Sequence, residues 1–181
     1  CVVVAPRAIH RGTFQKNNDV PYFREELTAK GSKVRVYMPH YLHLTSRKQT
    51  MGLSMGNHFR SVMAVIRREK LKPDMVYGHF IYQCGLTAAR VGEKLGIPAY
   101  CACGENSLRL ETGSKPYATG LQHHHWREIL AKLAGMVCVS GNNQRLLREN
   151  GFIGENMPSG IFPNGVDGDM FHPMERTVCR R

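Results

Sequence analysis

Short apolar runs alternate with longer amphipathic stretches along the whole chain. The apolar runs predict strands, and their nearly continuous apolar character is typical of parallel strands that are covered on both faces. The amphipathic stretches predict helices, and Gly31, Pro73 and Gly96 mark boundaries between the two kinds of element. The predicted strands are 2–5, 33–38, 75–77, 99–103, 136–139 and 160–162, and the predicted helices are 19–30, 56–71, 84–95, 121–133 and 142–149.

This alternation predicts an α/β fold with a doubly wound, Rossmann-like parallel sheet. In such folds, ligands bind at the carboxyl ends of the strands, near the point where the strand order reverses. Functional residues are therefore expected in the loops that follow the predicted strands.

The net charge of +11 comes from 25 Lys and Arg residues against 14 Asp and Glu residues. Such a field favours phosphate-rich partners: nucleic acid, anionic lipid or a nucleotide ligand. Nucleic acid is disfavoured, because aromatic residues are not interleaved with the basic ones and no helix-turn-helix or zinc signature occurs. The helix 56–71 groups Arg60, Arg67 and Arg68 on one side, which is either a solvated basic face or a surface for an anionic membrane.

The six cysteines do not form a metal or disulfide framework in the sequence. No C-x-x-C pair occurs, and four cysteines fall in or beside apolar runs, so we expect reduced, mostly buried thiols and a cytoplasmic protein. The run 123–126 contains three adjacent histidines, but two ligands on one helix face need a spacing of i,i+4. No metal site is predicted.

Four residues could carry chemistry in the predicted loops. Gly12 could let the first loop approach a phosphate or could serve only a turn, and no G-x-G-x-x-G or P-loop motif accompanies it. His79 could orient a substrate hydroxyl or accept its proton, or could simply bond to neighbouring backbone. Glu105 could bind sugar hydroxyls, act as a base or cap a short helix. Ser140 is a natural N-cap, and the helix that follows could attract an anion.

Four segments, taken in order, resemble the family-4 glycosyltransferases of the GT-B fold. Residues 162–173 resemble the family's PNGVD…F.P segment, and residues 72–79 resemble its kPDvihaH motif. Residues 96–98 precede a fourth-strand motif, and residues 136–140 resemble aDxvixvS. The resemblance covers roughly residues 70–173, and the first 55 residues match only in pattern.

The resemblance implies a two-lobed enzyme that transfers a sugar from a nucleotide-sugar to a glycan or lipid-linked acceptor, with retention at the anomeric carbon. Residues 1–173 would be the amino-terminal, acceptor-side lobe, and residues 174–181 would begin the interdomain linker. The carboxy-terminal donor lobe, with its pair of glutamates, would lie outside these residues, so we expect the chain alone to be inactive. The implied role is in cell-envelope or polysaccharide assembly, on the cytoplasmic side and peripheral to the membrane, with no cofactor or metal.

The resemblance also implies three kinds of role for individual residues. These are Gly12 and Thr13 on the donor-phosphate side, His79, Glu105 and Asn106 for the acceptor, and Ser140 and Asn164 at the interdomain cleft. Family members often place a histidine where this chain has Gly104, so a histidine role does not transfer there. Two alternatives remain open: a basic flavodoxin-like binding or regulatory domain without catalysis, and a lobe of a nucleotide-sugar epimerase, against which the segment 164–167 argues.

Overall fold

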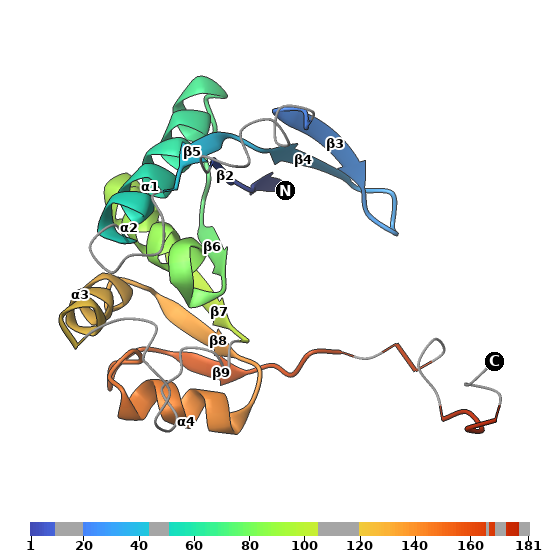
Figure 1. Cartoon of the computed structure of the whole chain (residues 1–181), viewed down its shortest axis with the longest axis vertical. Coiled ribbons are helices and arrows are strands. Elements are labelled where there is room, and N and C mark those ends of the chain that lie inside the picture. Colours follow the sequence, from blue (N-terminus) through green and yellow to red (C-terminus); the bar gives the residue numbers. More distant parts are fainter. Residues whose placement is uncertain (10–19, 44–50, 105–119, 166, 169–172, 178–181) are drawn as a thin grey trace.

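The computed structural model describes residues 1–9, 20–43, 51–104, 120–165, 167–168 and 173–177. Its centre is a four-stranded parallel sheet in the order β6-β7-β8-β9, made of β6 (Val76–His79), β7 (Ala99–Cys103), β8 (Gly135–Cys138) and β9 (Ser159–Ile161). The connecting helices are α2 (Leu86–Leu95), α3 (Gly120–Leu130) and α4 (Gly141–Glu149). Helices α2 and α3 lie on the same side of the sheet (Figure 1).

The amino-terminal part contributes two further sheets. Strand β1 (Val2–Val4) pairs in parallel with β4 (Lys33–Tyr37), and β4 pairs antiparallel with β3 (Phe23–Leu27). Strands β2 (Arg7–Ile9) and β5 (His40–Leu42) form a parallel pair, and α1 (Met51–Arg68) packs against β5 and α2. The chain is therefore mixed α/β with parallel sheets, as the sequence predicts. The expected single doubly wound sheet is met in part, because the described strands form three sheets.

The core lies between the central sheet and its helices. Strand β7 is buried along almost its whole length, and its side chains belong to one apolar core cluster with side chains of α2 and α3, including Leu130 and Trp126. Burying large apolar side chains of this kind stabilises the fold by about 2 kcal/mol each. The expectation of buried thiols is confirmed for Cys101, Cys103 and Cys138, whereas Cys1 and Cys84 are exposed and Cys179 lies outside the described residues.

The predicted helix 19–30 is wrong over its described part. Residues Phe23–Leu27 form β3, which pairs with β4 in a hairpin that projects from the body of the molecule (Figure 1). Gly31, expected to end a helix, instead occupies the hairpin turn with a φ of 77°, and its N–H donates to the Thr28 carbonyl. The hairpin prevails because β4 supplies a complete ladder of backbone partners, and the ion pair between Lys33 and Glu25 links the two strands at 2.9 Å.

Two local predictions are confirmed at helix ends. The Ser140 Oγ accepts a hydrogen bond from the backbone N–H of Asn143 at 3.1 Å, so Ser140 is the N-cap of α4. Gly96 ends α2 in the left-handed conformation with a φ of 69°. Among the described helices, none is both long and apolar enough to cross a membrane.

Candidate functional site

The carboxyl ends of the four central strands meet at one edge of the sheet. The parallel registers place His79 beside Ala102, and Cys138 beside both Cys103 and Ile161. The residues that follow these strands therefore lie along a common edge, which we call the carboxyl edge: His79 and Phe80 after β6, Gly104 after β7, Ser140 after β8 and Phe162 after β9 (Figure 1). This is the edge at which ligands bind in open parallel sheets.

His79 is exposed at the end of β6, where the sequence predicts a binding residue. Its Nδ1 lies 3.3 Å from the hydroxyl of Tyr77, two residues earlier on the same face of the strand. Its ring stands edge-on to that of Phe80, with centroids 4.3 Å apart. The imidazole is thus oriented by two aromatic neighbours and keeps a nitrogen available in a position that solvent reaches.

The turn after β6 is held in an unusual backbone conformation. Phe80 has a φ of 68° and a ψ of 149°, a region that is nearly restricted to glycine, and Gln83 in the irregular turn η2 (Ile81–Gly85) has a φ of 60°. Backbone hydrogen bonds hold Phe80 on both sides: its N–H donates to the Ala102 carbonyl at 2.8 Å, and its carbonyl accepts from Gly85 N–H at 2.8 Å. Strain of this kind persists only where the surroundings determine it, and it concentrates at functional sites.

Two glycines allow this turn to pack against the sheet. A Cβ at Gly78 would lie 2.6 Å from the backbone oxygen of Cys84, and a Cβ at Gly85 would lie 2.4 Å from the Sγ of Cys101. Neither position has room for a side chain, because the turn and β6–β7 are in direct contact. This close packing fixes the position of Phe80 relative to β6 and β7.

Side chains of β5 and of the residue that follows it anchor the same turn. The Tyr41 hydroxyl donates to Gln83 Oε1 at 2.9 Å, and Gln83 Nε2 lies 3.4 Å from His43 Nδ1. Burial raises the pKa of Tyr41, while its hydrogen bond to Gln83 acts in the opposite direction. The turn that carries Phe80 is therefore tied to the amino-terminal part of the chain as well as to the central sheet. Sequence analysis missed this anchor, because its members lie 42 residues apart.

A buried polar pair joins α1 to α2 below the anchor. His58 is 4% exposed and its Nδ1 lies 2.8 Å from the hydroxyl of Thr87, itself 5% exposed, while the Tyr41 ring packs edge-on against the imidazole. Burial lowers the pKa of His58 from 6.5 to about 4, so the imidazole is neutral near pH 7. No signal in the sequence singled out this histidine.

Helix α4, which follows β8, is hydrogen-bonded to β9 in addition to being capped by Ser140. Gln144 Nε2 donates to the Ser159 hydroxyl at 2.9 Å, and Arg148 donates to the same oxygen at 2.7 Å. The α4 N-terminus, with Ser140, therefore has a fixed position at the carboxyl edge. A helix start with its positive partial charge lies two strands away from His79.

The structure brings together some of the predicted site residues. His79 and Ser140 lie at the carboxyl edge, whereas Asn164 is exposed in the segment that leaves the body of the molecule after β9 (Figure 1). Gly12, Thr13, Glu105 and Asn106 lie outside the described residues. Phe80 and Tyr77 were not singled out from the sequence, although their proximity to the predicted histidine could have drawn attention to them.

The histidines of α3 lie apart from this edge. His124 and His125 are exposed and face Glu128, at 3.6 and 3.7 Å, while Trp126 is buried and packs near Tyr82. The described part of this helix start therefore has two exposed histidines and one buried aromatic residue. Within the described ranges, no group of three or more His, Cys, Asp or Glu side chains is placed to hold a metal ion.

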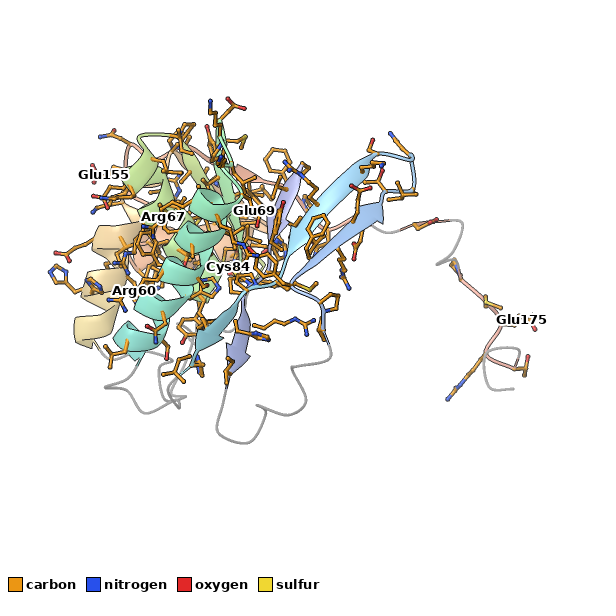
Figure 2. The ribbon with its side chains drawn as sticks, turned by 90° about the horizontal axis from the view of Figure 1, so that it is seen from above. Arg60, Arg67, Glu69, Cys84, Glu155 and Glu175 are labelled. Atoms are coloured by element: carbon orange, nitrogen blue, oxygen red, sulfur yellow. The ribbon has the colours of Figure 1, made fainter. Side chains whose placement is uncertain are left out.

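Helix α1 presents basic side chains to solvent. Arg60, Arg67 and Arg68 are exposed, and Figure 2 shows Arg60 and Arg67 projecting along this helix. Arg60 bonds to the Asn57 side chain at 3.1 Å, and Arg68 lies over the Tyr22 ring and 3.5 Å from Glu69. The face is basic overall, although one of its charges has an acidic neighbour.

No protein-family model matches the chain, and no curated protein matches it significantly.

Proposed function

We propose that the chain is the acceptor-binding lobe of a retaining glycosyltransferase, which transfers a sugar from a nucleotide-sugar to a glycan or lipid-linked acceptor. The observation that carries the proposal is the common location of three motifs of the resemblance. The segments 72–79 and 136–140 contain the carboxyl ends of β6 and β8, and the segment 162–167 begins directly after β9, so all three reach the same edge of a parallel sheet.

The chemistry of this edge is suited to a sugar hydroxyl. An exposed imidazole such as that of His79 can bond to a hydroxyl group, and in its neutral form an imidazole can accept a proton from one. The α4 N-terminus at Ser140 would favour a nearby phosphate, as in a nucleotide-sugar or a lipid diphosphate. Acceptor and phosphate would therefore be presented at the same sheet edge, two strands apart, with the donor sugar supplied by a second lobe.

The proposal includes one doubly wound sheet. Strands β1 and β6 are edge strands of their sheets, and Val3 in β1 and Tyr77 in β6 are 40% and 54% exposed. Pairing these two edges would give the order β3-β4-β1-β6-β7-β8-β9. The strand order would then reverse between β1 and β6, beside His79, which is where such folds bind ligands.

A basic face would help the lobe reach a lipid-linked acceptor. The net charge of +11 and the exposed arginines of α1 favour an anionic lipid surface, and we propose a cytoplasmic, peripheral location on that basis. Co-sedimentation with anionic and neutral vesicles tests this part. Pelleting that is negligible and equal with both kinds of vesicle would contradict it.

Transfer of labelled sugar by the intact gene product tests the function itself. The assay uses a panel of labelled nucleotide-sugars and a glycolipid extract, with His79→Ala as the test variant and His124→Ala, on the exposed face of α3, as the matched control. We expect His79→Ala to lower the transfer rate about ten-fold or more, because the protein loses the side chain that would form a hydrogen bond with the acceptor. Equal rates for His79→Ala and wild type would remove His79 from the site.

A further inference from the structure

Two exposed aromatic side chains flank His79 at the end of β6. Tyr77 is 54% exposed and Phe80 is 43% exposed, although large aromatic groups are normally shielded from water. The three rings follow one another along the strand, with centroid separations of 6.3 Å from Tyr77 to His79 and 4.3 Å from His79 to Phe80. We call this group the aromatic shelf.

The shelf is held in place by the surrounding structure. Both backbone polar groups of Phe80 are hydrogen-bonded, and the turn behind it is anchored by the Tyr41 hydroxyl on Gln83. The absence of a side chain at Gly104 leaves room beside the Phe80 ring, because a Cβ there would lie 3.6 Å from Phe80 Cε1. An exposed ring kept at a strained φ of 68° is costly to the fold, which indicates a function for the ring.

The arrangement of the rings distinguishes between possible ligands. The planes of His79 and Phe80 stand at 63° to each other, so they form a corner rather than two parallel faces that could enclose a flat base. Beside the apolar rings, the Tyr77 hydroxyl and His79 Nδ1 lie 3.3 Å apart as a polar rim. A pyranose ring has the matching pattern, with a C–H face that can pack on an aromatic ring and hydroxyl groups at its edge.

We propose that the aromatic shelf of Tyr77, His79 and Phe80 binds the C–H face of a pyranose ring in the acceptor, an inference that rests on the proposed function and specifies its ligand. Phe80 supplies the apolar platform, and Tyr77 and His79 bond to the hydroxyl groups at the ring edge. The ligand class is a glycoside whose ring is free to stack. A nucleobase is the competing ligand class.

The test is a titration of the ¹⁵N-labelled chain with methyl glucoside, with glycerol as a polyol that lacks a ring and uridine monophosphate as the base-bearing probe. We expect saturable shifts of the amide signals of His79, Phe80 and Gly104 with methyl glucoside, at an affinity on the order of millimolar, as befits one stacked ring. Glycerol should leave these signals unchanged. Shifts with uridine monophosphate but not with the glycoside would overturn the proposal in favour of a base, and no shift with either would also overturn it.

Phe80→Gly separates binding from folding. This variant removes the ring and relieves the backbone strain, so we expect an unchanged or higher Tm together with glycoside affinity lowered about ten-fold. The control is Phe23→Ala on the hairpin, because Phe23 is also 43% exposed and should bind as wild type does. Equal glycoside affinity for Phe80→Gly and wild type would refute the platform role.

The outcomes for the shelf and for the transferase are distinguishable. Glycoside binding at the shelf without transfer by the intact gene product would leave a sugar-binding module and overturn the enzyme. Transfer without glycoside binding at the shelf would keep the enzyme and overturn the shelf.

Discussion

Protonation of His58 should destabilise the folded chain at mildly acidic pH. The imidazole is 4% exposed between α1 and α2, and burial lowers its pKa from 6.5 to about 4. The unfolded chain therefore takes up a proton as the pH falls below about 6.5, while the folded chain resists it. Stability from this group is fully present above pH 6.5, declines as the pH falls and is lost once the pH is below about 4.

The size of the effect follows from the two pKa values. A change from 6.5 to about 4 corresponds to about 3 kcal/mol in total, of which roughly 2 kcal/mol is lost between pH 7 and pH 5. That loss is a large part of the stability of a typical domain, which is on the order of 10 kcal/mol. The chain should therefore become measurably easier to denature over a range of pH in which carboxylates still remain charged.

Urea denaturation at several pH values measures this loss. The only tryptophan, Trp126, is 2% exposed, so its fluorescence reports unfolding of the core. The control is His58→Asn, whose side-chain amide can take the place of Nδ1 toward Thr87 but does not titrate. Because the chain has nine histidines, the difference between the two proteins isolates this one.

We expect the free energy of unfolding of the wild type to fall by about 2 kcal/mol more than that of His58→Asn between pH 7 and pH 5. Parallel declines of the two proteins would refute the reasoning, because the proton would then be taken up elsewhere.

Three further predictions concern the carboxyl edge and its support. Ser140→Ala should lower the free energy of unfolding, measured in urea, by about 1 kcal/mol, because α4 loses its N-cap. Ser140→Asp should keep most of the wild-type stability, because an aspartate can also cap the helix. Equal stabilities for all three proteins would contradict the cap. Gly78→Ala should lower the free energy of unfolding by about 3 kcal/mol, because the added Cβ would lie 2.6 Å from the backbone oxygen of Cys84. An unchanged Tm would show that the turn can move aside. Cys84 should react with iodoacetamide much faster than Cys138, because Cys84 is exposed while burial raises the pKa of Cys138 to about 11; similar rates by mass spectrometry would contradict the burial.

The central sheet was predictable because its strands are short, apolar and separated by clear helix ends. Strand β7 has the predicted bounds, and β8 and β9 differ from prediction by one residue at each end. Local signals were enough to predict the helix ends. The end of α2 requires a positive φ, which Gly96 adopts, and Ser140 caps α4 through a hydrogen bond within its own helix. Burial on both faces makes each of these strands a short continuous apolar run, whose length distinguishes it from a helix.

The segment 23–27 shows why the amino-terminal part was harder to predict. The spacing of Phe23 and Leu27 suits a helix face, yet both side chains remain exposed in β3, at 43% and 70%. Their conformation is determined by backbone pairing with β4, a tertiary interaction that periodicity does not encode. Strands β2 and β5 escaped prediction because each has three residues and pairs across a long stretch of sequence.

The candidate site was predictable only in its central residue. His79 could be found because it lies at the end of a strand, and the position of a strand end is a local property. The positive φ values of Phe80 and Gln83 could not be found, because they are imposed by contacts with Ala102, Gly85 and Tyr41. Residues that act through such contacts become visible only when the fold brings them together.

The most direct test of the account compares the 181-residue chain with the intact gene product in the transfer of labelled sugar. The account predicts that the intact product labels a glycan or lipid-linked acceptor, with the donor's anomeric configuration retained, and that the 181 residues alone transfer nothing. Turnover of a nucleotide-sugar by the 181 residues alone, or an intact product that labels no acceptor, would contradict it.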